Sequence, residues 1–141
     1  CCLTWLEADV PLNIELRPHE KIFINGAVIA NGADRARISL LNDAAILREK
    51  DILTEEKADT PCKRVYLAIQ LMYMDPASRA KYQIYYEQLT AHVRERMPDT
   101  TSHIAEIDAD LATGHLYQAM RTARKLIDRE QEFLNHAPQP L

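Results

Sequence analysis

The sequence is short of glycine, cysteine and long apolar runs, and each shortage excludes a class of protein. Its 141 residues include three glycines, so it has no glycine-rich loop that could cradle a phosphate group. Three cysteines are an odd number and too few for a disulfide framework, which favours a reducing compartment. The longest apolar stretch, near residues 67–74, is far shorter than the ~20 residues of a membrane span. Nucleotide binding through such a loop and a membrane-spanning role are therefore not expected.

No residues have the spacing of a catalytic or metal site, so we expect neither an enzyme nor a metal or cofactor. The five histidines have no H-E-x-x-H, H-x-x-E-H or Cys-x-x-Cys companion. Cys62 falls in the first turn of a predicted helix beside Lys63 and Arg64, where the helix dipole lowers a thiol pKa. A partly buried, unreactive thiol is the main interpretation, and a reactive thiol is the alternative. No secretory signal is visible, and a lipoprotein beginning at Cys1 is a minor alternative.

Positive charge is also in short supply. Seventeen Lys and Arg residues stand against 21 Asp and Glu residues, which gives a net charge of −4. The field of the whole molecule therefore repels phosphate backbones and anionic lipids. Residues 1–60 carry the whole net charge, whereas residues 61–141 are balanced. A nucleic-acid site would have to be a local cluster of basic residues. Residues 61–141 repel RNA less than residues 1–60 do, because their charges are balanced.

Alternating apolar residues predict strands over residues 12–48. Apolar residues make up 47% of the chain, the proportion of an ordinary globular protein, and its length suits one domain or at most two small units sharing a core. Leu12, Ile14 and Leu16 alternate with polar residues, and further short apolar runs follow. The dipeptides Asn25-Gly26 and Asn31-Gly32 favour tight hairpin turns with positive φ. We therefore expect an antiparallel β-meander.

Beyond Lys50 the apolar spacing changes to that of helices. Thr60 is a candidate N-cap with Pro61 at the first helical position, and the helix it begins is apolar on nearly every face. Three more helices are expected: from Asp75-Pro76 to Pro98, from a cap at Thr101 or Ser102 to Gly114, and from about His115 onward. The predicted fold class is α+β, with an N-terminal antiparallel β-meander in residues 12–53 and a bundle of about four α-helices in residues 54–135 packed on it.

Basic residues gather in groups that could contact phosphates, although each one alone is usually a solvated surface charge. The groups are Arg35 and Arg37 around the third strand, Arg48 and Lys50 at the exit of the strands, Lys63 and Arg64 on the first helix, and Arg121, Arg124 and Lys125 on the last. The tyrosines Tyr82, Tyr85 and Tyr86 could stack on bases, but their helical spacing favours packing in the core.

From Leu12 onward the chain resembles the FlbT family of flagellar biosynthesis regulators. The segments that carry the resemblance are Ile14-Glu15-Leu16-x-Pro18-x-Glu20-Lys21, Ile24-Asn25-Gly26-Ala27-Val28-Ile29-x-Asn31-Gly32, Arg48-Glu49-Lys50-Asp51-Ile52-Leu53-Thr54, Ala58-Asp59-Thr60-Pro61 with Lys63-Arg64, Gln70-Leu71-Met72-Tyr73-x-Asp75-Pro76, Tyr117-x-Ala119 and Ala123-Arg124-Lys125-Leu126-Ile127. Residues 1–11 depart from the pattern and are interpreted as an upstream extension or a cloning remnant, and residues 136–141 as a loose tail. Cys62 stands where a small residue is typical, which argues against a thiol role.

The resemblance implies a cytoplasmic, post-transcriptional regulator that couples flagellin synthesis to flagellum assembly. Family members act on the 5′ untranslated leader of flagellin mRNA and alter its translation and decay, with the small protein FlaF as a functional counterpart. Repression is the usual direction, and activation is the alternative. An acidic protein that binds a leader must concentrate Arg and Lys on one face or act through another protein. The rival hypothesis is therefore an adaptor that docks flagellin, FlaF or a ribonuclease, with no membrane partner in either case.

Overall fold

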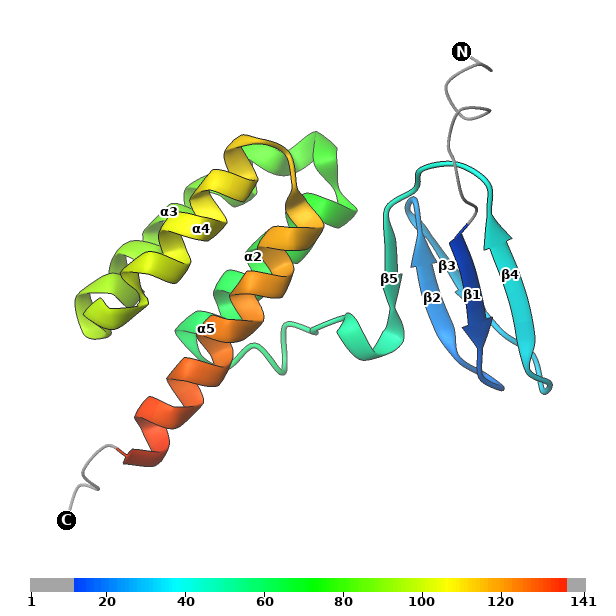
Figure 1. Cartoon of the computed structure of the whole chain (residues 1–141), viewed down its shortest axis with the longest axis horizontal. Coiled ribbons are helices and arrows are strands. Elements are labelled where there is room, and N and C mark those ends of the chain that lie inside the picture. Colours follow the sequence, from blue (N-terminus) through cyan, green and yellow to red (C-terminus); the bar gives the residue numbers. More distant parts are fainter. Residues whose placement is uncertain (1–11, 137–141) are drawn as a thin grey trace. The chain divides into compact units, whose positions relative to one another are not determined.

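The computed structural model describes residues 12–136, which fold as two compact units (Figure 1). The boundary between the units lies between Ile52 and Leu53. We call residues 12–52 the β unit and residues 53–136 the helical unit. The extension expected over residues 1–11 lies outside the described residues, as do residues 137–141 of the expected tail. His136, the first residue of that tail, still belongs to the last helix.

The β unit consists of two small antiparallel sheets. Its strands are β1 (Leu12–Leu16), β2 (Lys21–Ile24), β3 (Ala27–Ala30), β4 (Ala36–Leu40) and β5 (Ile46–Arg48), followed by the short 3₁₀ helix η1 (Glu49–Asp51). Strand β1 pairs with β4, while β2 lies between β3 and β5. Ile14, Leu16 and Ile22 form the centre of a small apolar core, because alternate residues of a strand face the same side.

The fold class is confirmed, since antiparallel strands precede four α-helices, but the strand order is not that of a meander. Strand β3 does not pair with β4, because Asn31-Gly32 forms no hairpin turn and Gly32 has no positive φ. The Asn31 side chain instead donates hydrogen bonds to the carbonyl oxygens of Arg17 (2.8 Å) and Asp34 (2.9 Å). Through these bonds the Asn31 amide joins the loop after β3 to the loop after β1. The next strand, β4, then pairs with β1 and not with β3.

The turn at Asn25-Gly26 is confirmed. Both residues have positive φ, 45° at Asn25 and 89° at Gly26, and they join β2 directly to β3. Positive φ at both central residues is the mark of a type I′ turn, whose twist matches that of the flanking strands. The Asn25 carboxamide oxygen also accepts a hydrogen bond of 2.8 Å from the backbone N–H of Ala45, which ties this hairpin to the segment before β5.

The helical unit contains four α-helices with short 3₁₀ turns before α3 and α4. They are α2 (Pro61–Met74), η2 (Pro76–Ser78), α3 (Arg79–Arg96), η3 (Pro98–Thr100), α4 (Thr101–Ala112) and α5 (Leu116–His136). Helix α2 packs against α3 and α5, and α4 packs against α5 (Figure 1). Six consecutive residues of α2, from Val65 to Gln70, are buried, and so is Met72, as the continuous apolar run predicts. No helix in residues 12–136 has the length and hydropathy needed to cross a membrane.

The predicted cap at Thr60 and the predicted end of a helix at Gly114 are confirmed. The Thr60 hydroxyl oxygen caps α2 by accepting from the backbone N–H of Lys63 at 3.3 Å. Gly114, with φ 80°, follows α4, and the N–H of His115 donates to the carbonyl of Asp110 at 2.8 Å, as in a Schellman motif. The cap predicted at Thr101 or Ser102 is wrong. Helix α4 already includes both residues, because η3 leads the chain into it.

Candidate nucleic-acid interface

The nine predicted basic residues are divided between the two units. Arg35, Arg37, Arg48 and Lys50 belong to the β unit, whereas Lys63, Arg64, Arg121, Arg124 and Lys125 belong to the helical unit. A phosphate-binding surface needs cations that are exposed and not already engaged by carboxylates. The surroundings of each residue therefore decide which of the two sets is better suited to RNA.

Arg48 is a structural tie within the β unit. Its guanidinium forms a forked pair with the Glu20 carboxylate at 3.0–3.2 Å and also donates to the carbonyl oxygen of Glu15 at 2.6 Å. The backbone N–H of Arg17 donates to the same carboxylate at 2.9 Å. That hydrogen bond and the guanidinium of Arg48 lower the pKa of Glu20. Because its donors are engaged, Arg48 has little left to offer a phosphate.

The other basic residues of the β unit are exposed. Arg37 on β4 pairs with Glu15 on the neighbouring strand at 3.1 Å. This pair is open to water, where such contacts contribute little and are readily exchanged. Arg35 and Lys50 are exposed residues just before β4 and within η1. The unit therefore carries exposed cations, but two of its four arginine and lysine candidates face carboxylates.

Lys63 and Arg64 lie in the first turn of α2 and are partly engaged. The Lys63 ammonium is 3.2 Å from the Asp59 carboxylate and lowers its pKa, and the Arg64 Nε–H donates to the carbonyl oxygen of Ala58 at 3.2 Å. Both contacts link α2 to the segment before it. Arg64 stays exposed despite this contact, whereas Lys63 is half-buried.

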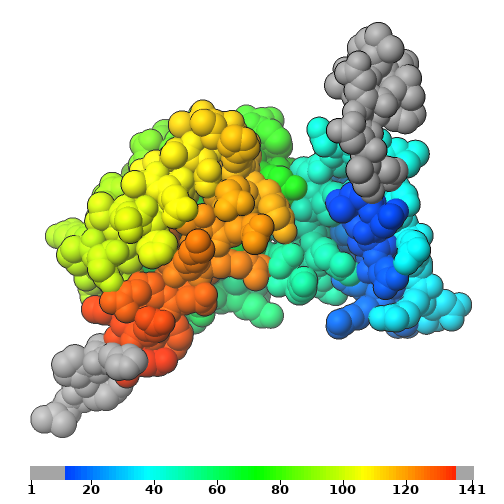
Figure 2. Space-filling model, in the orientation of Figure 1, coloured from blue at the N-terminus to red at the C-terminus, as the bar shows by residue number. Residues whose placement is uncertain are grey.

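Arg121, Arg124 and Lys125 form an exposed stripe on α5, and we call these three residues the α5 stripe. Their spacing of three and four residues places them on one side of the helix, opposite the buried Met120 and Leu126. Arg121 and Lys125 have no ion-pair partner among residues 12–136. Figure 2 shows α5, in orange to red, along the visible surface of the helical unit.

Arg124 is held in place by a tyrosine of α2. Its guanidinium lies 5.4 Å from the centre of the Tyr66 ring, and it donates to the Tyr66 hydroxyl at 3.3 Å. Such a cation–π contact fixes the long side chain without neutralising its charge. This contact could not be predicted from the sequence, because the two residues are 58 positions apart and no local pattern connects them.

The tyrosines of α3 are divided between core and surface. Tyr86 is fully buried and its hydroxyl donates to the Asp108 carboxylate at 2.7 Å, so burial raises its pKa. Tyr85 is exposed, and Tyr82 is half-buried. Core packing is therefore confirmed for Tyr86, and Tyr85, at 38% exposed, is the most exposed of the three tyrosines.

Cys62 is a buried, unreactive thiol. It is fully buried, and burial together with the neighbouring Glu130 raises its thiol pKa. The helix-dipole effect that would lower this pKa is outweighed because the Glu130 carboxylate occupies the N-terminus of α2 and accepts from the Cys62 backbone N–H at 3.2 Å. The alternative of a reactive thiol is wrong.

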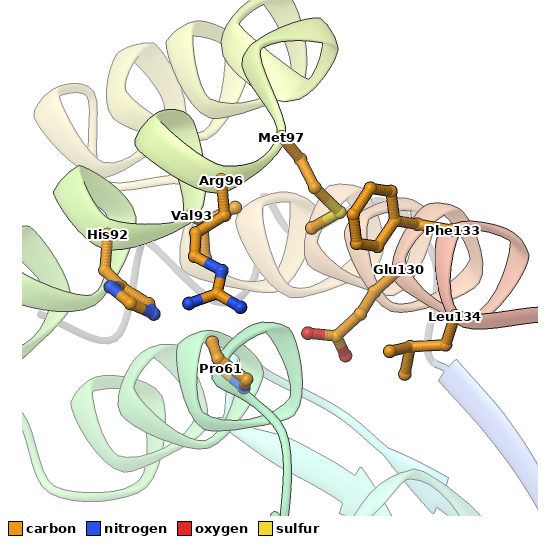
Figure 3. A pocket seen from close by; sticks show the side chains of 8 residues that line it. All are labelled: Pro61, His92, Val93, Arg96, Met97, Glu130, Phe133 and Leu134. Carbon is orange, nitrogen blue, oxygen red and sulfur yellow. The ribbon is translucent and has the colours of Figure 1, made fainter. Parts of the chain in front are cut away.

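A pocket of about 290 Å³ opens between the start of α2, the end of α3 and the last turns of α5. Figure 3 shows Arg96 and Glu130 reaching into it, with Met97 and Phe133 on its apolar side. Phe133 and its neighbour Leu134 are exposed hydrophobic residues. The sequence does not predict this pocket, because its lining comes from three helices and has no motif.

No group of three metal-ligating side chains gathers within the described residues.

Comparison with known proteins places the chain among flagellar proteins. The profile of the family described as "Flagellar protein FlbT" matches residues 12–134. The "Probable flagellum biosynthesis repressor protein FlbT" of Rhodopseudomonas palustris is 42% identical over 126 residues, which cover 89% of the chain and 99% of that protein. The "Flagellum biosynthesis repressor protein FlbT" of Caulobacter vibrioides is 34% identical over 132 residues, covering 90% of the chain and 92% of that protein. No solved structure matches the chain.

Proposed function

The chain belongs to the FlbT family of flagellar proteins, and we propose that it is a post-transcriptional regulator of flagellin expression that binds the 5′ untranslated leader of flagellin mRNA. Binding there alters translation and decay of the message in the cytoplasm and couples flagellin synthesis to flagellum assembly. The observation that carries the regulatory role is the match with proteins named flagellum biosynthesis repressors over nearly their whole length. Those names describe regulators, in keeping with an expectation that the chain is not an enzyme.

Charge distribution supports the α5 stripe as the RNA contact. Phosphates are bound mainly by Arg and Lys, and the stripe offers three such side chains on one exposed helix face. Arg121 and Lys125 are not engaged by carboxylates of the described residues, unlike Arg37, Arg48 and Lys63. An acidic protein can bind RNA when a local cluster of this kind overcomes the repulsion of its net charge.

The test is a titration of labelled flagellin leader RNA with the full chain at two salt concentrations. A scrambled RNA of equal length is the control for sequence selectivity. We expect leader-selective binding that weakens steeply with salt, because each neutralised phosphate releases counterions. The double variant Arg121→Gln/Lys125→Gln should reduce the slope of log affinity against log salt by about 2, roughly one for each lost phosphate contact.

A matched variant removes the same two charges elsewhere in the helical unit. Lys81→Gln/Arg96→Gln alters two exposed cations of α3 and should leave the salt slope unchanged. If both variants weaken binding equally, net charge and not the α5 stripe governs affinity. If the wild-type chain binds neither RNA at micromolar concentration, direct leader binding is wrong.

The alternative function is a protein-interaction adaptor that docks flagellin, FlaF or a ribonuclease. One observation favours it: the pocket at the end of α5 joins an apolar wall to exposed Phe133 and Leu134. Exposed apolar residues beside a pocket are typical of protein-binding surfaces. A Phe133→Ser/Leu134→Ser variant should then lose the regulatory effect in cells while its RNA affinity stays that of the wild type.

A further inference from the structure

Within residues 12–136, strand β3 is an unpaired, uncharged edge of the three-stranded sheet. It ends the strand order β3-β2-β5, and all four of its residues, Ala27–Ala30, are exposed. Val28 is 68% exposed and Ile29 is 42% exposed, on opposite faces of the strand. Natural edge strands are usually protected by charge, proline or a bulge, because a bare edge pairs with other strands. This strand contains neither a charged residue nor proline.

The register of the β2–β3 hairpin determines which backbone groups face outward. Ile24 pairs with Ala27 beside the two-residue turn, and the N–H of Asn31 donates to the carbonyl of Glu20 at 2.8 Å. Hydrogen-bonded and non-hydrogen-bonded pairs alternate along an antiparallel ladder, so Ala27, Ile29 and Asn31 direct their backbone groups toward β2. The N–H and C=O groups of Val28 and Ala30 therefore point away from the sheet.

The β unit also has little core of its own. Residues 12–52 approach the ~40-residue length below which a domain usually needs a disulfide, a metal or oligomerisation. They contain no cysteine, and no metal-ligand group occurs in the described part of the chain. Five of their hydrophobic residues are buried. Of a disulfide, a metal and oligomerisation, only oligomerisation is left for these residues, and the exposed edge of β3 provides a surface for it.

We propose that β3 pairs with β3 of a second copy of the chain, so that two three-stranded sheets join into one. An antiparallel two-fold arrangement with Ile29 opposite Ile29 of the partner copy places Val28 of each copy opposite Ala30 of the other. Both outward residues of each strand then exchange backbone hydrogen bonds, which gives four bonds across the interface. A second copy fits because two uncharged strands meet without repulsion of like charges.

The first test is the oligomeric state of the full chain. Light scattering or sedimentation at about 100 µM should give twice the chain mass of 16.2 kDa. Val28→Lys places like charges near the two-fold axis and should give the monomer mass, with an unchanged circular dichroism spectrum. Leu41→Lys is the matched control, because Leu41 is also an exposed hydrophobic residue but lies just after β4. It should leave the dimer intact.

The second test reads the register and does not depend on the stability of a charged variant. In a Cys1→Ser/Cys2→Ser background, Ile29→Cys places one thiol in each copy at position 29, opposite position 29 of the partner copy. The two residues form a non-hydrogen-bonded pair, in which the Cα atoms are about 4.5 Å apart. That spacing permits a disulfide, so oxidation should give a covalent dimer. Val28→Cys places the two thiols two residues out of register, at Cα distances beyond the ~7 Å limit, and should stay monomeric under denaturing conditions.

The outcomes are distinct from those of the RNA titration, since dimer formation requires no RNA. A monomeric wild-type chain at 100 µM would overturn the proposal, as would a dimer that persists in a folded Val28→Lys variant. Equal cross-linking of Ile29→Cys and Val28→Cys would overturn the register. A monomer whose β3 amides become protected from exchange only when another protein binds would assign the edge to a foreign strand instead.

Discussion

The β unit and the helical unit differ in how they hold their clearest candidate phosphate-binding residues. In the β unit, the half-buried Arg48 donates to acceptors that join β5 to β1 and to the loop before β2, and Arg37 is paired across strands. In the helical unit, the α5 stripe lies on an exposed helix face. Arginine therefore connects strands at Arg37 and Arg48, whereas the arginines and lysine of the α5 stripe leave a cationic surface. Counting basic residues in the sequence does not separate these two uses.

The two units differ as much in their cores. Among the described residues, five buried hydrophobic residues belong to the β unit and eighteen to the helical unit. Helix α2 packs on both α3 and α5, and α5 packs on both α2 and α4, so each of the two buries a whole apolar face. The helical unit can thus stabilise itself and still present a charged face, whereas the β unit leaves an edge strand exposed.

The largest effect should come from truncating one buried isoleucine in each unit. Ile69 in α2 and Ile22 in β2 are both fully buried, and each change to Ala should cost about 2–5 kcal/mol. Hydrogen exchange should show lost protection in the helices for Ile69→Ala and in the strands for Ile22→Ala. If either change lowered protection equally in both units, the two cores would unfold as one. The two units would then not differ in the stability of their cores.

A pair of glycine substitutions should separate the two Asn-Gly dipeptides by about 1–2 kcal/mol. Gly26 has φ 89°, so Gly26→Ala forces a side chain into the left-handed region and destabilises the hairpin by that amount. Gly32 has no positive φ and open space around its Cα, so Gly32→Ala should have little effect. Thermal melting of both variants measures the difference. Equal melting temperatures would contradict the conformational difference between the two sites.

These two sites show how much of the fold the sequence could predict. Period-two and helical spacing predicted the elements correctly, and local chemistry predicted the cap at Thr60 and the turn at Asn25-Gly26. Strand order was missed because it depends on contacts between distant residues. The Asn31 carboxamide bonds to carbonyls as far as 15 positions away, and these contacts replace the second hairpin that the dipeptide alone favours.

The same limit applies to the candidate site. The sequence predicted nine basic residues, and the exposure of Arg121, Arg124 and Lys125 agrees with the helical spacing that grouped them. It could not show that Glu20 binds Arg48 from 28 positions away, or that Tyr66 lies beneath Arg124. Contacts of this kind join residues that are distant in the sequence, so only the structure separates structural cations from available ones.

A smaller effect is expected from a polar group in the core of the helical unit. The Thr122 side chain is buried in α5, and its hydroxyl has no hydrogen-bond partner among the described residues. Burying an unsatisfied hydroxyl costs about 1 kcal/mol or more, and Val has nearly the same shape. Thr122→Val should therefore stabilise the helical unit by about 1 kcal/mol in urea unfolding. A loss of stability would show that the hydroxyl has a partner, such as a buried water.

The smallest effect, and the one that bears on the charge contrast directly, is the pH dependence of the β unit. The Arg17 backbone N–H and the Arg48 guanidinium lower the pKa of Glu20 below its ordinary value of 4.5. A carboxyl whose pKa is lower in the folded state stabilises the fold above its unfolded pKa, and this stabilisation is lost as the pH falls through the folded value. The Glu20 contribution should therefore be complete at neutral pH, begin to fall near pH 4.5 and be lost once the pH is below the lowered pKa of the folded state.

Glu20→Gln should remove that part of the acid sensitivity. Hydrogen exchange of the β-unit amides between about pH 6 and pH 3, corrected for intrinsic rates, should show a shallower loss of stability in the variant than in the wild type. Glu56→Gln, a change at an exposed residue of the helical unit, should leave the β-unit profile unchanged. Identical profiles for wild type and Glu20→Gln would mean that Arg48 is not held by this carboxylate in solution. Its guanidinium would then be available to a phosphate, and Arg48 would no longer differ from the α5 stripe in this respect.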